Sequence, residues 1–220
     1  MRLRLATAWN IVKAWLLVQS GCALLAAIAL PFHEYRIVSL LVFFGLLVAG
    51  AAYWYGDRVA LGMVGARELP LGENPALHGT VERLAVASGL PKPRLYLLPD
   101  GHPRALSAGR GPRGAAIAVS RGFLGAATPA ELEGVIAHEL AHIRNRDILV
   151  QTLAVVVAAA LLETSRIGGW LSRALLFVLG PVAAAVVHLL LSPKRELVAD
   201  RAAATLTGSP HGLADALIRL

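Results

Sequence analysis

The chain is poor in charged residues and almost free of cysteine. Only 16% of its 220 residues are Asp, Glu, Lys or Arg, whereas 56% are hydrophobic. Soluble domains carry about a quarter charged residues, so this balance argues against an ordinary soluble domain and favours an integral membrane protein. The single cysteine, Cys22, excludes an internal disulfide and a cysteine-based metal site.

Aromatic residues are also scarce, at 6%, while Lys and Arg outnumber Asp and Glu by 21 to 14 and give a net charge of +7. A nucleic-acid-binding surface gathers its basic residues in one patch, whereas here they are scattered, so we expect no nucleic-acid partner. The Gly-rich stretch Ser107–Gly114 lacks a following Walker lysine. It therefore predicts a turn between strands and not a phosphate-binding loop.

Four long apolar segments are present, at Trp9–Leu30, Ile37–Tyr55, Ile148–Leu162 and Trp170–Leu191. A bilayer-spanning helix needs about 20 such residues, and short connectors join the segments in pairs, so we expect two transmembrane hairpins in a lipid bilayer. The first segment follows the basic start Met1–Arg4 and is also compatible with a signal peptide. Its length and the second span directly after it favour an uncleaved anchor.

These segments divide the chain into a first hairpin (1–56), a polar domain (57–147), a second hairpin (148–191) and terminal helices (192–220). The expected fold class is a mainly α integral membrane protein with four apolar helices and a small α+β domain. Arg36, Arg166 and Arg173 lie in or near the hairpin connectors, and the remaining basic residues lie on the opposite side or in the polar parts. By the positive-inside rule, both termini and the polar domain are expected to be cytoplasmic.

Local signals predict the elements of the polar domain. Asn74 before Pro75 is typical of a helix start, and this helix is expected to end at Gly89. Arg94–Pro99 and Ala115–Ser120 are apolar stretches of strand length. Thr128-Pro129-Ala130-Glu131 matches a capping box with a first-turn proline, which predicts the start of another helix.

That second helix carries His138, Glu139 and His142. Residues four apart on a helix nearly eclipse, so both imidazoles can face one point. Glu139 lies about 100° further round, where its carboxylate can accept a proton from a water activated by a metal. The spacing is that of the zinc motif H-E-x-x-H. Two buried histidines bonded to backbone carbonyls are an equally good interpretation of these residues alone.

A zinc helix of this kind needs a third protein ligand, and the expected topology narrows the choice. The downstream candidates are Asp147, Glu163, His188, Glu196, Asp200, His211 and Asp215. Glu163 would lie across the membrane and His188 within an apolar segment, whereas Glu196 follows two crossings and returns to the side of His138. Asp200, one turn later, suits a carboxylate that orients a histidine. A solvated, salt-bridged helix is the other interpretation of Lys194–Arg201.

With these motifs in this order, the chain resembles the HtpX-like membrane zinc metalloproteases, relatives of the CAAX prenyl endopeptidases. The resemblance rests on Ala137–Asp147 and Arg195–Asp200, on the four apolar segments, and on Pro103–Leu124. It covers nearly all of the chain. It implies a zincin-type catalytic domain and a zinc endopeptidase of the prokaryotic inner (plasma) membrane with a cytoplasmic active site. Its implied role is membrane-protein quality control or stress response, with misfolded membrane proteins as polypeptide substrates.

The resemblance also implies a role for each site residue. One Zn²⁺ ion would be held by His138, His142 and Glu196, with Glu139 as the general base and Asp200 as the orienting carboxylate. The stretch Ala115–Ser120 would lie beside the cleft, where an extended substrate adds as a further strand.

The chain departs from the family pattern in two places. Family members have Asn-Ala-Phe where this chain has Arg104-Ala105-Leu106, and they continue beyond the position of Leu220 with basic and histidine residues. If that extension supplies the side chain that stabilises the oxyanion in the family, His102, Arg104 or His211 would have to take its place here. An inactive zinc-stabilised scaffold or chaperone-like binder therefore stays an alternative, as does a zinc hydrolase of lipid esters. His33 and His78 are expected to be surface histidines.

Overall fold

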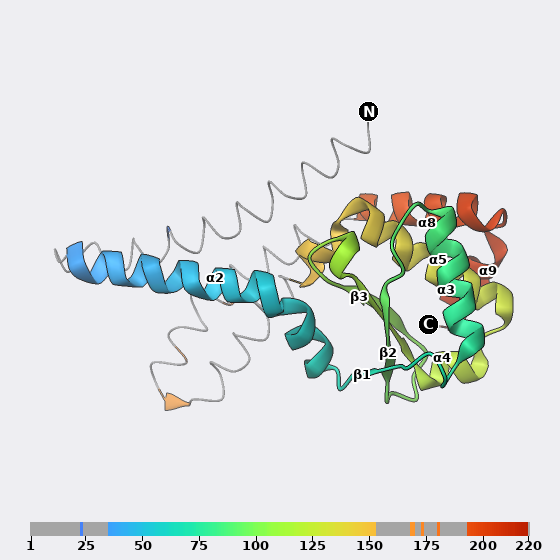
Figure 1. Ribbon diagram of the computed structural model, residues 1–220, viewed down its shortest axis with the longest axis horizontal. Helices are drawn as coiled ribbons and strands as arrows, with labels where there is room; N and C mark the ends of the chain where they lie inside the picture. The colour runs from blue at the N-terminus through green and yellow to red at the C-terminus, as the bar shows by residue number, and fades with distance from the viewer. Residues whose placement is uncertain are drawn as a thin grey trace.

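A computed structural model describes residues 35–152 and 193–219, with the isolated positions 23, 168, 169, 173 and 180. Apart from these isolated positions, the expected apolar segments Trp9–Leu30 and Trp170–Leu191 fall outside the described residues, as do most of Ile148–Leu162 and His33. The described part consists of one long helix that projects from a domain built on a four-stranded sheet (Figure 1).

The projecting helix is α2, Tyr35–Met63, which contains the expected segment Ile37–Tyr55 and continues beyond it. Its C-terminal end packs on the sheet through Leu61, which is buried, and Asp57 forms an ion pair of 2.7 Å with Arg94. The expected boundary after residue 56 thus falls inside a helix. Among the helices that the structure describes, none combines the length and the apolar character needed to cross a membrane.

The sheet has the strand order β1-β2-β4-β3. Its strands are β1 (Arg67–Glu68), β2 (Arg94–Leu98), β3 (Ala105–Ala108) and β4 (Ala116–Ser120). β2 and β4 are parallel, while β1 and β3 run antiparallel to their neighbours. The two expected strands are therefore confirmed. The expected turn at Ser107–Gly114 is confirmed in part. Its first residues, Ser107 and Ala108, belong to β3, and only the remainder connects β3 to β4, through the 3₁₀ helix η2 (Pro112–Gly114).

β4 is an interior strand, buried on both faces. Ile117 and Val119 join the larger apolar core, whereas Ala116 and Ala118 join the smaller cluster beneath the end of α2. Covering on both faces explains why this strand is continuously apolar. The expectation that a substrate adds as a strand to Ala115–Ser120 is wrong, because both edges of β4 are already paired with β2 and β3. Among the described strands, β3 is the edge strand nearest to this region.

The helices of the domain begin where the local sequence signals predict. α3 spans Pro75–Ala87, and the Asn74 side chain accepts a hydrogen bond from the backbone N–H of Leu77. The expectation for His78 is wrong. Its ring is buried, because it lies on the core-facing side of α3, and its Nε2 is 3.2 Å from the carbonyl oxygen of Leu69.

After β4 come α4 (Arg121–Ala126) and α5 (Pro129–Asn145), the helix that carries the H-E-x-x-H motif. The capping box at its start is confirmed: Thr128 and Glu131 each accept a hydrogen bond from the other's backbone N–H. A further helix begins at Asp147, and Ile148 at its start is buried in the larger core. The third apolar segment therefore begins inside the domain.

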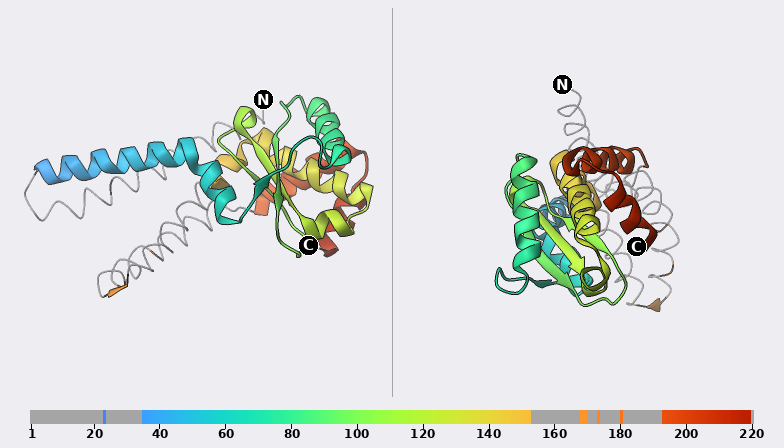
Figure 2. Two further views of the ribbon diagram at one scale, coloured as in Figure 1. Left: turned by 60° about the horizontal axis from the view of Figure 1, so that its bottom comes forward. Right: turned by 90° about the vertical axis from the view of Figure 1, so that its right-hand side faces the viewer.

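α5 is the central helix of the domain. One side of it packs with α3 over the sheet, and α8 (Pro193–Thr207) and α9 (His211–Arg219) pack on its outer side (Figures 1 and 2). α5 and the start of α9 approach closely where two glycines meet the opposite backbone. A Cβ atom at Gly134 would lie 2.5 Å from the backbone nitrogen of Leu213, and one at Gly212 would collide with the carbonyl group of Ala130. The crossing requires glycine at both positions.

Replacing Gly134 with alanine is expected to lower the free energy of unfolding by about 1–3 kcal/mol, because the added methyl group overpacks a contact with backbone that cannot rotate away. The control is Gly79→Ala in α3, where nothing lies within 4 Å of the new Cβ atom. That change is expected to stabilise the helix by about 0.5–1 kcal/mol. Thermal or denaturant unfolding of the two variants measures both effects, and equal shifts would contradict the close crossing.

Candidate metal centre

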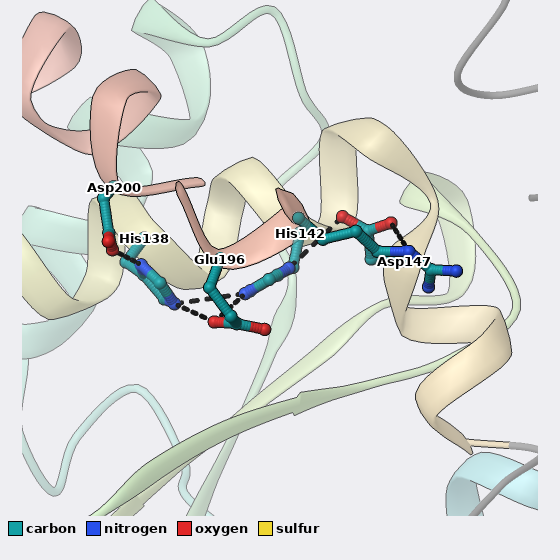
Figure 3. Close-up of polar contacts among 6 residues, drawn as sticks. His138, His142, Asp147, Glu196 and Asp200 are labelled. Carbon is teal, nitrogen blue, oxygen red and sulfur yellow. Dashed lines mark hydrogen bonds and ion pairs between the residues drawn. The ribbon is translucent and has the colours of Figure 1, made fainter. Parts of the chain in front are cut away.

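Two helices bring three potential metal ligands to one point. The Nε2 atoms of His138 and His142, on α5, are 3.1 Å apart. Glu196, in the first turn of α8, places its Oε2 atom 3.4 Å from the first and 3.5 Å from the second of these nitrogens. Figure 3 shows the Glu196 carboxylate at the ends of the two rings. The three residues that the sequence singled out are therefore neighbours in space.

The spacing and chemistry of these donors fit a zinc ion. Zinc ligands in a tetrahedral site lie about 2.0–2.2 Å from the ion, and hence about 3.3 Å from one another. The three observed separations, 3.1, 3.4 and 3.5 Å, bracket this value. Two imidazoles and one carboxylate are a common donor set for catalytic zinc.

A carboxylate supports the far side of each imidazole. The Nδ1 atom of His138 is 2.9 Å from Oδ1 of Asp200, and the Nδ1 atom of His142 is 3.3 Å from Oδ2 of Asp147 (Figure 3). The contact with Asp147 is a hydrogen bond, which holds the proton on Nδ1 of His142 and leaves its Nε2 free to bind a metal, whereas Asp200 lies close to Nδ1 of His138 without hydrogen-bond geometry. Asp200 thus lies where the sequence placed it. These contacts also rule out the interpretation in which both histidines are satisfied by backbone carbonyls.

The sequence reasoning missed the role of Asp147. On an uninterrupted helix, a residue five positions after His142 would be rotated about 140° away from it. The structure instead ends α5 at Arg146, which adopts the left-handed conformation with φ 60°, and the chain then turns into the next helix. This break returns the Asp147 side chain to His142, where it is buried. An acidic residue just before an apolar segment was the available signal for a new helix start.

Glu139 follows His138 on α5, and its side chain is largely buried, at 8% exposure. Other candidates lie elsewhere in the described structure. Arg104 pairs with Asp100 before β3, His102 is exposed in the same loop, and His211 and Asp215 are exposed on α9. Glu163 and His188 fall outside the described residues.

Without a metal, neighbouring side chains of the site carry opposite charges. Burial lowers the pKa of His142, but hydrogen bonds to the carboxylates of Asp147 and Glu196 outweigh it and raise the pKa to about 10. Hydrogen bonds from His138 and then from His142 hold the pKa of Glu196 well below its usual range. At neutral pH the metal-free site therefore pairs an imidazolium with a carboxylate.

This ionisation predicts that zinc uptake releases a proton. His142 must be neutral to bind a metal, and its folded pKa of about 10 lies above the ordinary value of about 6.5. Its ion pairs stabilise the metal-free fold below pH 6.5, and this stabilisation is lost as the pH rises towards 10. Zinc affinity should increase over the same range, with about one proton released per zinc at pH 7–8. Titration calorimetry in buffers of different ionisation enthalpy measures that proton, and its absence would contradict the assignment.

The fold and the donor set together define a class of protein. Two histidines one turn apart, a glutamate between them, and a third carboxylate from a later helix are the arrangement of a zinc-dependent metallopeptidase.

The chain belongs to peptidase family M48, whose family model matches residues 72–220, and it is thus a zinc metalloendopeptidase by family. It is 40% identical over 194 residues to "Protease HtpX homolog" of Persephonella marina, a match that covers 81% of this chain and 67% of the relative. The relative of the same name from Pelotomaculum thermopropionicum is 37% identical over 231 residues, covering 96% of this chain and 82% of the relative. The resemblance to the HtpX-like proteases is confirmed.

A solved structure is similar in fold. Ste24p of S. mikatae aligns with a TM-score of 0.51 at 19% identity, covering 100% of this chain and 59% of that one. At this identity the similarity supports the fold alone.

Proposed function

We propose that this chain cleaves polypeptides internally by zinc-dependent hydrolysis, with one Zn²⁺ ion bound by His138, His142 and Glu196. The observation that carries the proposal is the convergence of their three donor atoms within 3.1–3.5 Å, with carboxylates behind both imidazoles. A zinc ion bound there supplies Lewis acidity, which acidifies a water molecule and polarises the scissile carbonyl.

The side chains around the ion have separate tasks. Glu139 accepts a proton from the attacking water as the water oxygen bonds to the carbonyl carbon. It then passes this proton to the amine nitrogen as the C–N bond breaks. Asp147 holds the imidazole of His142 in the tautomer that presents Nε2, and Asp200 lies beside Nδ1 of His138.

The substrate is proposed to bind in extended form along β3, since this edge strand contacts α5 and one of its sides is unpaired among the described strands. Main-chain hydrogen bonds of this kind hold a peptide with little dependence on its sequence. The relevant strand is therefore Ala105–Ala108, which includes part of the stretch where this chain departs from the family's Asn-Ala-Phe.

We further propose a location in the inner membrane of a prokaryote, with the active site and both termini in the cytoplasm. The four apolar segments and the distribution of Lys and Arg support this topology. Misfolded membrane proteins are the proposed substrates, in quality control or stress response, because such proteins present extended segments beside the bilayer.

Metal removal tests the activity. The purified full-length chain, loaded with zinc, is expected to cleave casein into peptides that mass spectrometry identifies. A chelator should abolish cleavage and added zinc should restore it, whereas chelator already saturated with zinc, the control, should have no effect. Zinc binding without chelator-sensitive cleavage would instead favour the scaffold, and fatty-acid release without peptide products would favour a lipid ester hydrolase.

A further inference from the structure

A buried ion pair connects α8, which supplies Glu196, to the start of the helix that follows α5. The Nε atom of Arg195 lies 3.7 Å from Oδ1 of Asp147, and the two side chains are only 12% and 3% exposed. The other oxygen of Asp147 contacts His142. Arg195 also directly precedes Glu196 in the sequence. A chain of contacts therefore runs from the helix of the third ligand, through Asp147, to the second histidine.

The first turn of α8 has little apolar packing to hold it. Leu197 and Val198 are 50% and 52% exposed, and the Glu196 side chain is 50% exposed as well. The fully buried residues of α8, Ala199 and Ala203, come only after the ligand. Arg195 is thus the one largely buried side chain in the described turn that carries Glu196.

The ion pair is better suited to orientation than to stability. The Nη1 and Nη2 atoms of Arg195 are buried and, within the described structure, have no hydrogen-bond partner. Burying a guanidinium with so few acceptors costs free energy, so the intact pair as a whole contributes little net stability. A charged pair at this position instead fixes the first turn of α8 relative to the start of the helix at Asp147.

We propose that Arg195 is a positioning residue for the metal centre, acting through Asp147 to fix the first turn of α8 so that Glu196 meets His138 and His142. This inference rests on the proposed metal site. Among the described contacts of the site, Arg195 touches none of the three donor atoms, and its effect is transmitted by the carboxylate of Asp147, which contacts His142.

The first test replaces Arg195 with methionine, which keeps much of the side-chain length and removes the charge. The zinc dissociation constant of the full-length protein, measured by competition with a chromogenic chelator, is expected to rise about 10- to 100-fold, as for loss of other outer partners of metal ligands. The visible absorption of the cobalt-substituted variant should also change, because the ligand geometry relaxes. The matched control is Arg201→Met on the same helix, where the arginine is exposed and both readouts should stay at wild-type values.

A double-mutant cycle tests whether Arg195 acts through Asp147. Asp147→Asn is expected to weaken zinc binding by itself, and adding Arg195→Met to it should change the affinity little further. Independent, additive losses, or wild-type affinity and cobalt absorption in Arg195→Met, would overturn the proposal. If the methionine variant does not fold, Arg195→Lys decides: an affinity between those of wild type and Asp147→Asn supports the proposal, and wild-type affinity overturns it.

The proposed metal site has its own test in the same assay. If the wild-type chain binds no zinc, or if His138→Ala leaves zinc affinity unchanged, the metal site itself is wrong. If His138→Ala abolishes binding but Arg195→Met does not weaken it, only the positioning role of Arg195 fails.

Discussion

Replacing Glu139 with glutamine is expected to abolish peptide-bond hydrolysis while zinc stays bound. Glutamine has nearly the same shape but cannot accept a proton from the attacking water, so general-base catalysis, worth about 10²- to 10⁴-fold in rate, is lost. Glu139 lies about 100° round the helix from His138, away from the direction in which the imidazoles point. Zinc content should therefore be unchanged. Casein cleavage and zinc content are both measured on the same preparation.

The matched control for this change is Glu133→Gln, on the same helix α5. Glu133 is partly exposed and pairs with Arg83 on the surface of the domain, so its replacement should leave both zinc content and cleavage at wild-type levels. Wild-type cleavage by Glu139→Gln would sink the assignment of the base. Loss of zinc in that variant would point to a ligand role for Glu139.

Replacing Glu196 with alanine is expected to remove zinc and activity together. Glu196 is the one proposed ligand outside α5, and its carboxylate contacts the Nε2 atoms of both histidines. Removal of a direct ligand should weaken zinc binding beyond the about 10- to 100-fold typical of an outer partner. Asp200→Asn, which affects only the contact behind His138, should produce the smaller effect.

Equilibrium zinc competition on the full-length variants measures this order of effects. Glu82→Gln provides a control, because Glu82 is an exposed carboxylate paired with Lys92 on the surface. If Glu196→Ala bound zinc as tightly as wild type, the third ligand would have to lie elsewhere in the chain.

Much of the site could be predicted because its signals are local. The four-residue spacing of His138 and His142 determines that both face one side of a helix, and the capping box at Thr128 determines where that helix begins. The strands at Arg94–Leu98 and Ala116–Ser120 were readable because they are short, continuous apolar stretches between turn residues. The prediction of Glu196 as a ligand required one further step, namely the expected return of the chain to the side of the membrane on which His138 lies.

The surface position expected for His78 shows where local signals fail. Its residue type favours the surface, but it lies three residues before Val81, on the same apolar face of α3. The structure packs that face into the core, where the His78 ring meets the carbonyl group of Leu69.

The sequence by itself determined the helix that carries the H-E-x-x-H motif, two of the strands beside it and the candidate ligands. Only the tertiary structure decided that Asp147 stands behind His142, that β3 and not β4 is the edge strand, and that Gly134 allows α9 to lie against α5. The physical reason is the same in each case. Helical and strand periodicity report which residues share a face, but a left-handed break at Arg146, the order of strands in a sheet and the closeness of two backbones depend on contacts between segments distant in the chain.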